Sequence, residues 1–103
     1  MTGGVLKMLG LGMRAGALTV GTGGIRAALR RDELALVIVA SDRSTRTNQR
    51  VVRLAQARGT PLIFGPSAAE LGHSVGRPAL QAVGVRDTQL AAGIKTRSAA
   101  EGL

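Results

Sequence analysis

The sequence lacks most of the residues that carry covalent and metal chemistry. Its 103 residues include no cysteine, tryptophan or tyrosine, and its aromatic content is one phenylalanine, Phe64. Without cysteine there is no disulfide, no thiol nucleophile and no cysteine-based zinc or iron–sulfur site. The single histidine, His73, cannot build a histidine metal site, and a lone histidine is more often a packed or surface side chain. We therefore expect no metal and no cofactor.

Long apolar runs are also missing. No segment approaches the roughly 20 apolar residues that a membrane-spanning helix needs, and the first residues do not resemble a secretion signal. We expect a cytoplasmic protein without a membrane partner. The scarcity of aromatic rings also disfavours modules that stack single-stranded bases on an aromatic platform.

Positive charge, by contrast, is abundant. Fourteen Lys and Arg residues face six Asp and Glu residues, which gives a net charge of +8, and twelve of the basic residues are Arg. A GC-rich genome explains the preference for Arg over Lys but not the excess of positive charge. Such an excess in a small domain predicts a polyanionic partner. Residues 1–60 carry ten basic and three acidic side chains, whereas residues 61–103 carry four and three, so we expect the N-terminal part to bind it.

Hydrophobic patterning predicts alternating helices and strands. Helices are expected over residues 4–14, 23–31, 45–58, 67–74 and 87–94, and strands over residues 17–20, 34–40, 60–64 and 79–85. The run at 34–40 is continuously apolar, which is typical of a strand buried on both faces beside a parallel neighbour. Gly10 and Gly12 weaken the first helix but permit close packing. The pattern predicts one α/β domain over residues 1–94, with a small sheet between helical layers, and a frayed tail over residues 95–103.

Two segments are candidates for binding an anion. The turn at Gly21–Gly24 opens the second helix, where free backbone N–H groups and the helix dipole attract phosphate, although the turn is neither a Walker loop nor a complete dinucleotide fingerprint. Basic side chains follow it and recur on the helix at 45–58. They are Arg26, Arg30 and Arg31, then Arg46, Arg50 and Arg53. The alternatives are a flexible turn and solvated helix faces.

No catalytic constellation is evident. Asp42 follows a buried strand, a place where ligand-facing residues often lie, and its alternative role is helix capping. The hydroxyl groups of Ser41, Ser44 and Thr45 have no evident base nearby, and the acidic residues form no credible acid–base pair. We expect the protein not to be an enzyme.

Several strings, in order and spacing, resemble a known family. They are Leu9–Gly16, Gly21 at the start of the second helix, Leu36–Asp42, Thr60-Pro61 and Glu70–Gly76. Over roughly residues 4–94 the sequence resembles the kink-turn-binding ribosomal-protein superfamily (large-subunit protein seven-Ae/thirty-e type), and within it the short bacterial YlxQ-like members. The resemblance implies a three-layer α-β-α sandwich with a small four-stranded mixed sheet. It also implies RNA binding, often to kink-turns with tandem sheared G·A pairs.

The start of the second helix departs from the family pattern G-x-N-E-x-x-K, in which the Asn, Glu and Lys contact the G·A bases and nearby backbone. Gly21 matches the first position, but Gly23 stands for the Asn, Gly24 for the Glu and Ala27 for the Lys. All three base-reading side chains are therefore missing. The resemblance then implies phosphate-dominated, salt-sensitive binding without preference for kink-turns.

Other basic residues partly compensate for this loss. Arg31 matches a basic position of the family one turn later, and Arg26 partly replaces the missing Lys. The family's second contact, an apolar loop before the last strand, is here the short basic segment Gly76-Arg77-Pro78.

We predict a non-enzymatic, ribosomal-protein-like partner of structured RNA, with the ribosome and translation-related proteins as further candidate partners. The candidate RNA-binding residues are Gly21, Thr22, Gly23, Gly24, Arg26, Arg30, Arg31, Asp42, Arg43, Arg46, Arg77 and Pro78. The alternative is a protein-interaction module that keeps the fold and has lost RNA binding. A third hypothesis, a small enzyme acting on a phosphorylated substrate at Gly21–Gly24, lacks a nucleophile–base pair.

Overall fold

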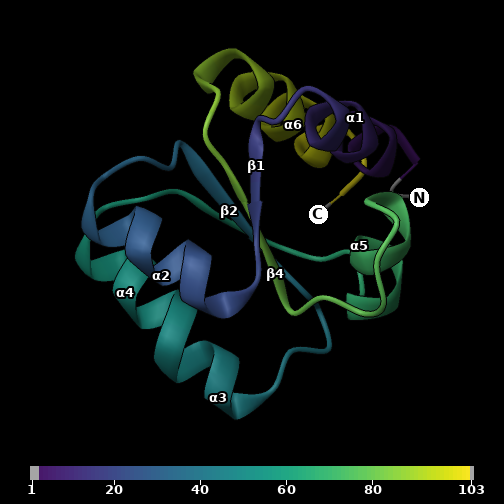
Figure 1. The fold of residues 1–103 in the computed structure, drawn as a ribbon. Coiled ribbons are helices and arrows are strands. Elements are labelled where there is room, and N and C mark those ends of the chain that lie inside the picture. Colours follow the sequence, from purple (N-terminus) through teal and green to yellow (C-terminus); the bar gives the residue numbers. More distant parts are fainter. Residues whose placement is uncertain (1–2, 103) are drawn as a thin grey trace.

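The elements follow one another in the predicted alternating order. A computed structural model describes residues 3–102 (Figure 1). Its helices are α1 (Gly3–Arg14), α2 (Thr22–Arg30), α3 (Thr45–Thr47), the π-helical η1 (Asn48–Val52), α4 (Arg53–Ala57), α5 (Ala68–Ser74) and α6 (Thr88–Ala100). Its strands are β1 (Leu18–Val20), β2 (Leu36–Val39), β3 (Leu62–Phe64) and β4 (Ala82–Val85).

The four strands form one mixed sheet in the order β1-β4-β2-β3. Strand β4 is antiparallel to both β1 and β2, and β3 is parallel to β2. Strands β1, β2 and β3 therefore run in the same direction and end at the same edge of the sheet. This common edge matters for function because the turns that start α2 and α3 both leave the sheet there.

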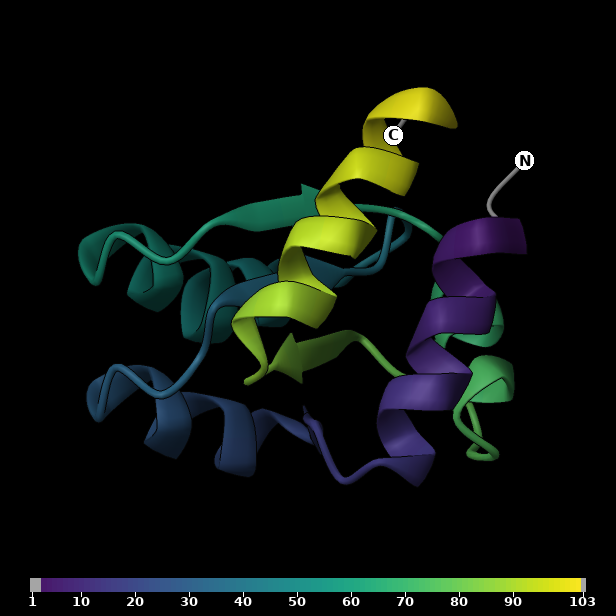
Figure 2. The same cartoon turned by 90° about the horizontal axis from the view of Figure 1, so that it is seen from above.

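Helices cover both faces of the sheet. Figures 1 and 2 show α2, α3 and α4 on one side of the strands and α1, α5 and α6 on the other. Side chains of β2 alternate between the two cores: Ile38 packs in the core beneath α1, α5 and α6, whereas Val37 and Val39 pack in the core beneath α2 and α4. All residues of β2 are buried, as its continuous apolar run predicts. The predicted three-layer α-β-α sandwich with a four-stranded mixed sheet is confirmed.

The long helix expected over residues 45–58 is a continuous helical segment of three parts. Ser44 caps its start, because the Ser44 hydroxyl oxygen accepts a hydrogen bond from the N–H of Thr47 at 3.2 Å. The middle part, η1, is a π-helical turn, a feature often found at functional sites. The expected helix is correct in extent, but the π-helical turn has no signature in the sequence pattern.

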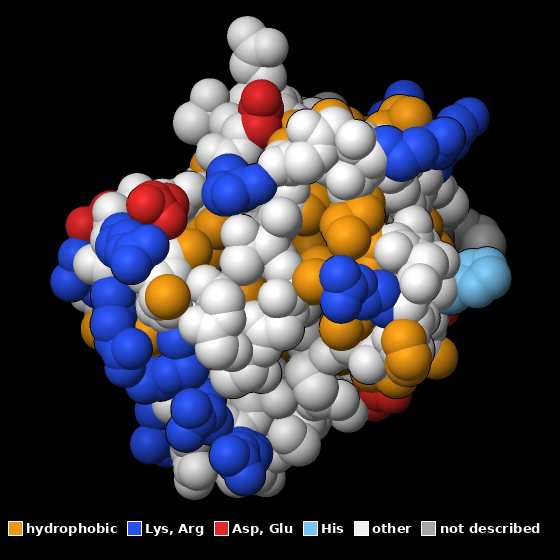
Figure 3. All heavy atoms as spheres, in the orientation of Figure 1, with side chains coloured by type: hydrophobic (Ala, Val, Ile, Leu, Met, Phe, Trp, Pro, Cys, Tyr) orange, Lys and Arg blue, Asp and Glu red, His pale blue; other side chains and the backbone are white. Residues whose placement is uncertain are grey.

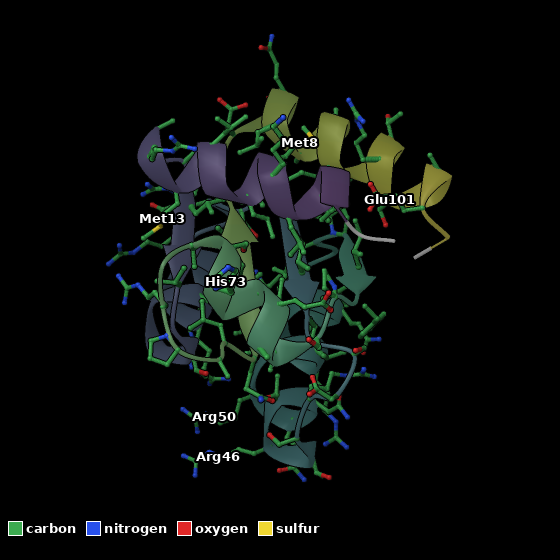
Figure 4. All side chains as sticks on the ribbon, turned by 90° about the vertical axis from the view of Figure 1, so that its right-hand side faces the viewer. Met8, Met13, Arg46, Arg50, His73 and Glu101 are labelled. Carbon is green, nitrogen blue, oxygen red and sulfur yellow. The ribbon has the colours of Figure 1, made fainter. Side chains whose placement is uncertain are left out.

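The C-terminal helix is longer than the sequence pattern predicts. The expectation that it ends at Ile94 and that the chain frays from Lys95 is wrong, because α6 continues to Ala100. Contacts with α1 hold this extension: Ser98 is buried, and the N–H of Gly4 donates to the Glu101 carboxylate at 3.0 Å. Figure 4 shows Glu101 at the end of α6 beside the start of α1. Such support from a neighbouring helix is a tertiary effect that local sequence periodicity does not report.

Gly12 lies where α1 packs closely on other side chains. A Cβ atom placed on Gly12 would lie 2.6 Å from the Leu90 side chain of α6, so a larger residue would require the Leu90 side chain to shift. Within residues 3–102, no helix combines the length and apolarity needed to cross a membrane.

Candidate nucleic-acid interface

The common edge of the sheet carries a pocket of about 290 Å³. Its lining residues come from the start of α2, the start of the α3–η1 helix and the residue before β4. They are Thr22, Gly23, Ser44, Arg46, Thr47, Arg50 and Gln81. The structure thus places Thr22 and Gly23 of the first turn next to Arg46, three of the residues that the sequence analysis assigned to one RNA-binding surface.

The start of α2 presents open backbone to this pocket. Gly21 adopts a φ of 88°, a conformation that residues with a side chain rarely adopt. Of the side chains that the structure describes, none caps this end of the helix, so its first N–H groups and their partial positive charge are available to an anion. A Cβ atom placed on Gly23 would have no neighbour within 4 Å. Gly24 is exposed one residue further along the same turn.

Gln81 holds the start of α3 in place at the pocket. Its side-chain oxygen accepts hydrogen bonds from the backbone N–H of Ser44 at 2.8 Å and from the hydroxyl of Thr47 at 3.1 Å. These bonds tie the segment before β4 to the first turn of α3. Sequence reasoning missed both Gln81 and Thr47, since a glutamine before a strand belongs to no motif. Thr47 had one weak signal, its position three residues after the capping Ser44.

Arginine side chains supply the positive charge of the pocket. Arg46 and Arg50 both line it, and Figure 4 shows their side chains pointing the same way from their helix. Arg26 of α2 donates a hydrogen bond to the backbone carbonyl of Arg50. Burial, followed by the nearby charges of Arg30 and Arg50, lowers the pKa of Arg26. The two helices therefore hold several like charges close together.

These charges are not neutralised within the described part of the chain. None of its carboxylates forms an ion pair with Arg26, Arg46 or Arg50. Figure 3 shows Lys and Arg side chains gathered over the side of the molecule formed by α2, α3 and α4. Like charges held together without acidic partners repel each other, and a bound polyanion would relieve that repulsion.

At the C-terminal ends of α2 and α4, by contrast, one arginine is neutralised by a carboxylate. Arg58, which follows α4, forms a salt bridge of 2.6 Å with Asp32, which follows α2. The hydrogen bond between them lowers the pKa of Asp32 and raises that of Arg58. Arg30 and Arg31 are exposed at this end and do not line the pocket. Arg30 lies close enough to Arg26 to lower the pKa of that side chain, but Arg26, Arg30 and Arg31 lie outside the lining of the pocket.

The loop after β2 has structural roles of its own. The Asp42 carboxylate accepts a hydrogen bond from the N–H of Ala68 at 2.8 Å, so it stabilises the start of α5, the alternative considered for this residue. The Arg43 Nε donates to the Asn48 side-chain oxygen at 2.6 Å. Neither Asp42 nor Arg43 lines the pocket.

The segment before β4 reaches the pocket through Gln81, not through the predicted residues Arg77 and Pro78. Arg77 and Pro78 are exposed and do not line the pocket, whereas Gln81 of the same segment does. The N–H of Arg77 donates to the carbonyl of Gly72 at 2.9 Å, which anchors this segment on α5. Nothing in the structure tests RNA contacts at any of the candidate residues, so those assignments stay predictions. His73 is exposed on α5 (Figure 4).

Known proteins share this architecture. A protein with unknown function from Bacillus halodurans has a structure similar to this chain with a TM-score of 0.79 and 27% sequence identity, covering 88% of this chain and 96% of that one. The 15.5kD RNA binding protein of Giardia lamblia matches with a TM-score of 0.75 at 17% identity, covering 96% of this chain and 85% of that one. No curated protein matches the sequence.

The sequence model of one family covers almost the whole domain. It matches residues 4–95, and its description is the ribosomal protein L7Ae/L30e/S12e/Gadd45 family. This match spans the strings at Leu9–Gly16, Leu36–Asp42 and Glu70–Gly76 and confirms the resemblance drawn from them. The chain belongs to the ribosomal protein L7Ae/L30e/S12e/Gadd45 family.

Proposed function

We propose that this protein is a non-enzymatic RNA-binding protein that holds structured RNA mainly through its phosphates. The observation that carries the proposal is the pocket between the first turn of α2 and the first turn of α3. Arg46 and Arg50 line it beside the first turn of α2. Among the described residues, no carboxylate pairs with either arginine and no side chain caps that turn. Membership of a ribosomal-protein family and the structural similarity to an RNA binding protein of Giardia lamblia support RNA as the polyanion.

The groups that line the pocket suit phosphate better than base edges. Guanidinium and backbone N–H groups are the donors that most often bind phosphate oxygens. The hydroxyl of Thr22 adds a short polar group beside them. Gly23 and Gly24 offer no side chain where the family pattern has Asn and Glu. Since a bidentate base contact contributes about 1–3 kcal/mol of discrimination, we propose that kink-turns are not preferred over other structured RNA.

The test is a titration of the purified protein against two labelled RNAs across a salt series. One RNA contains a kink-turn, and the other is the same duplex with its tandem G·A pairs replaced. We expect equal affinities and a linear fall of the logarithm of the binding constant with the logarithm of salt concentration.

Each other outcome contradicts a different part of the proposal. Tighter binding of the kink-turn would show that backbone and arginine groups supply base specificity without the Asn and Glu side chains. No binding of either RNA at low salt would refute RNA binding and favour a protein-interaction module. Ribosomal RNA and translation-related proteins are the first natural partners to test once binding is established.

A further inference from the structure

The single aromatic ring of the protein is exposed at the edge of the sheet. Phe64 ends β3 and retains 41% exposure. It pairs in parallel register with Val39, whose side chain packs in the core beneath α2 and α4. Because paired residues of neighbouring strands project from the same face of a sheet, Phe64 lies on the side that carries the arginine-rich helices. Its exposure has no explanation in core packing.

Arg43 lies over this ring. The centre of its guanidinium group is 4.4 Å from the ring centroid, within the range of a cation–π contact. Two hydrogen bonds hold the guanidinium group in place: Nε donates to the Asn48 side-chain oxygen at 2.6 Å, and Nη1 donates to the Ala40 carbonyl at 3.5 Å. A flat cationic group and a flat aromatic ring are thus presented together at the surface.

Arg43 and the residue that holds it are chain neighbours of residues that line the pocket. Arg43 directly precedes Ser44, which lines the pocket, and Asn48, which holds Arg43, follows the pocket residue Thr47. Strand β3 ends at the same edge of the sheet as β1 and β2. The ring is thus connected to the pocket through two short stretches of chain, Arg43-Ser44 and Thr47-Asn48.

We propose that Phe64 and Arg43 form a stacking site for one unpaired nucleobase, and this inference rests on the proposed RNA binding. Aromatic rings and guanidinium planes are the surfaces on which proteins stack splayed-out RNA bases. A single ring is too small to stack several bases, but it can stack one base. A base within a duplex is already stacked, so the RNA that this site selects carries an unpaired nucleotide in a loop, a bulge or an end.

The absence of tryptophan and tyrosine from the chain provides a direct test. Phe64→Trp places the only strong fluorophore at the site, and Leu11→Trp is the matched control, because Leu11 is 52% exposed on α1 in the opposite helical layer. Each variant is titrated with a hairpin RNA that has an adenine-rich loop, and with inorganic polyphosphate. Anisotropy of the end-labelled hairpin reports binding independently of the tryptophan.

We expect the hairpin to quench the emission of Phe64→Trp and to leave that of Leu11→Trp unchanged. Polyphosphate, which has no base, should leave both unchanged. Hairpin binding without quenching at position 64 would refute the stacking site while leaving RNA binding intact. No hairpin binding by anisotropy would refute the proposed function, and the stacking site with it.

A second variant tests the site without a new fluorophore. Phe64→Leu keeps an apolar side chain but removes the ring, and circular dichroism confirms that the variant is folded. Loss of one stacked base should weaken hairpin binding about 5- to 150-fold and leave binding of a blunt, fully paired duplex unchanged. Unchanged hairpin affinity, or an equal loss for both RNAs, would overturn the proposal.

Discussion

The two arginines of the pocket should contribute measurably to the salt dependence of RNA binding. Arg46 and Arg50 line the pocket, and neither pairs with a carboxylate of residues 3–102, so we expect each of them to neutralise one phosphate. Every neutralised phosphate contributes about 0.9 to the slope of log K against log salt for duplexes, and about 0.7 for single strands. Replacing both with glutamine should therefore lower the slope by about 1.4 to 1.8.

This difference is large enough to measure. For a duplex, wild type should lose about 12-fold more affinity between 50 and 200 mM salt than Arg46→Gln/Arg50→Gln. The assay is fluorescence anisotropy with a labelled duplex at four or more salt concentrations.

The matched control removes the same net charge from the opposite helical layer. Lys7 and Lys95 are exposed on α1 and α6, so Lys7→Gln/Lys95→Gln should leave the slope near that of wild type. If the control lowers the slope as much as the pocket variant, RNA binding depends on the net charge of the protein and not on the position of these two arginines. An unchanged slope in the pocket variant would refute a phosphate site at Arg46 and Arg50.

Three further predictions concern stability. A Cβ atom on Gly72 would lie 1.9 Å from the backbone oxygen of Pro78. Gly72→Ala should therefore reduce the free energy of unfolding, measured in urea, by about 1–3 kcal/mol. An unchanged free energy would show that the loop before β4 can move away from the added methyl group without cost. Gln81→Ala removes the acceptor of two hydrogen bonds and should cost about 1–3 kcal/mol and weaken RNA binding, whereas Gln81→Glu should retain most of the stability. The Arg58 hydrogen bond lowers the pKa of Asp32 from 3.8, so the salt bridge stabilises the fold above that pH, and its contribution is lost as pH falls through the lowered pKa. Asp32→Asn should therefore unfold at lower urea than wild type at pH 7, and the two midpoints should converge at the acid end of a pH series; a gap that persists there would rule out the salt bridge as its source.

Local pattern in the sequence determined the order of elements and the family. The continuous apolar run around β2 predicts a strand buried on both faces, because only a central strand between two helical layers buries every side chain. The strings at Leu9–Gly16 and Glu70–Gly76 lie within the segment that the family model matches. Charge counts also located the basic half of the chain, since composition does not depend on tertiary contacts.

Tertiary structure alone decided which of these residues meet. The pocket joins Thr22 to Gln81, residues far apart in the chain, because β1 and β2 flank β4 and end at the same edge. The same arrangement separates Arg30 from the pocket although it lies only two turns from Gly23, and it brings Phe64 beside Arg43. The extension of α6 to Ala100 depends on contacts with α1. Strand order and helix packing are non-local, so hydrophobic periodicity specifies which face of an element is buried but not which neighbour covers it.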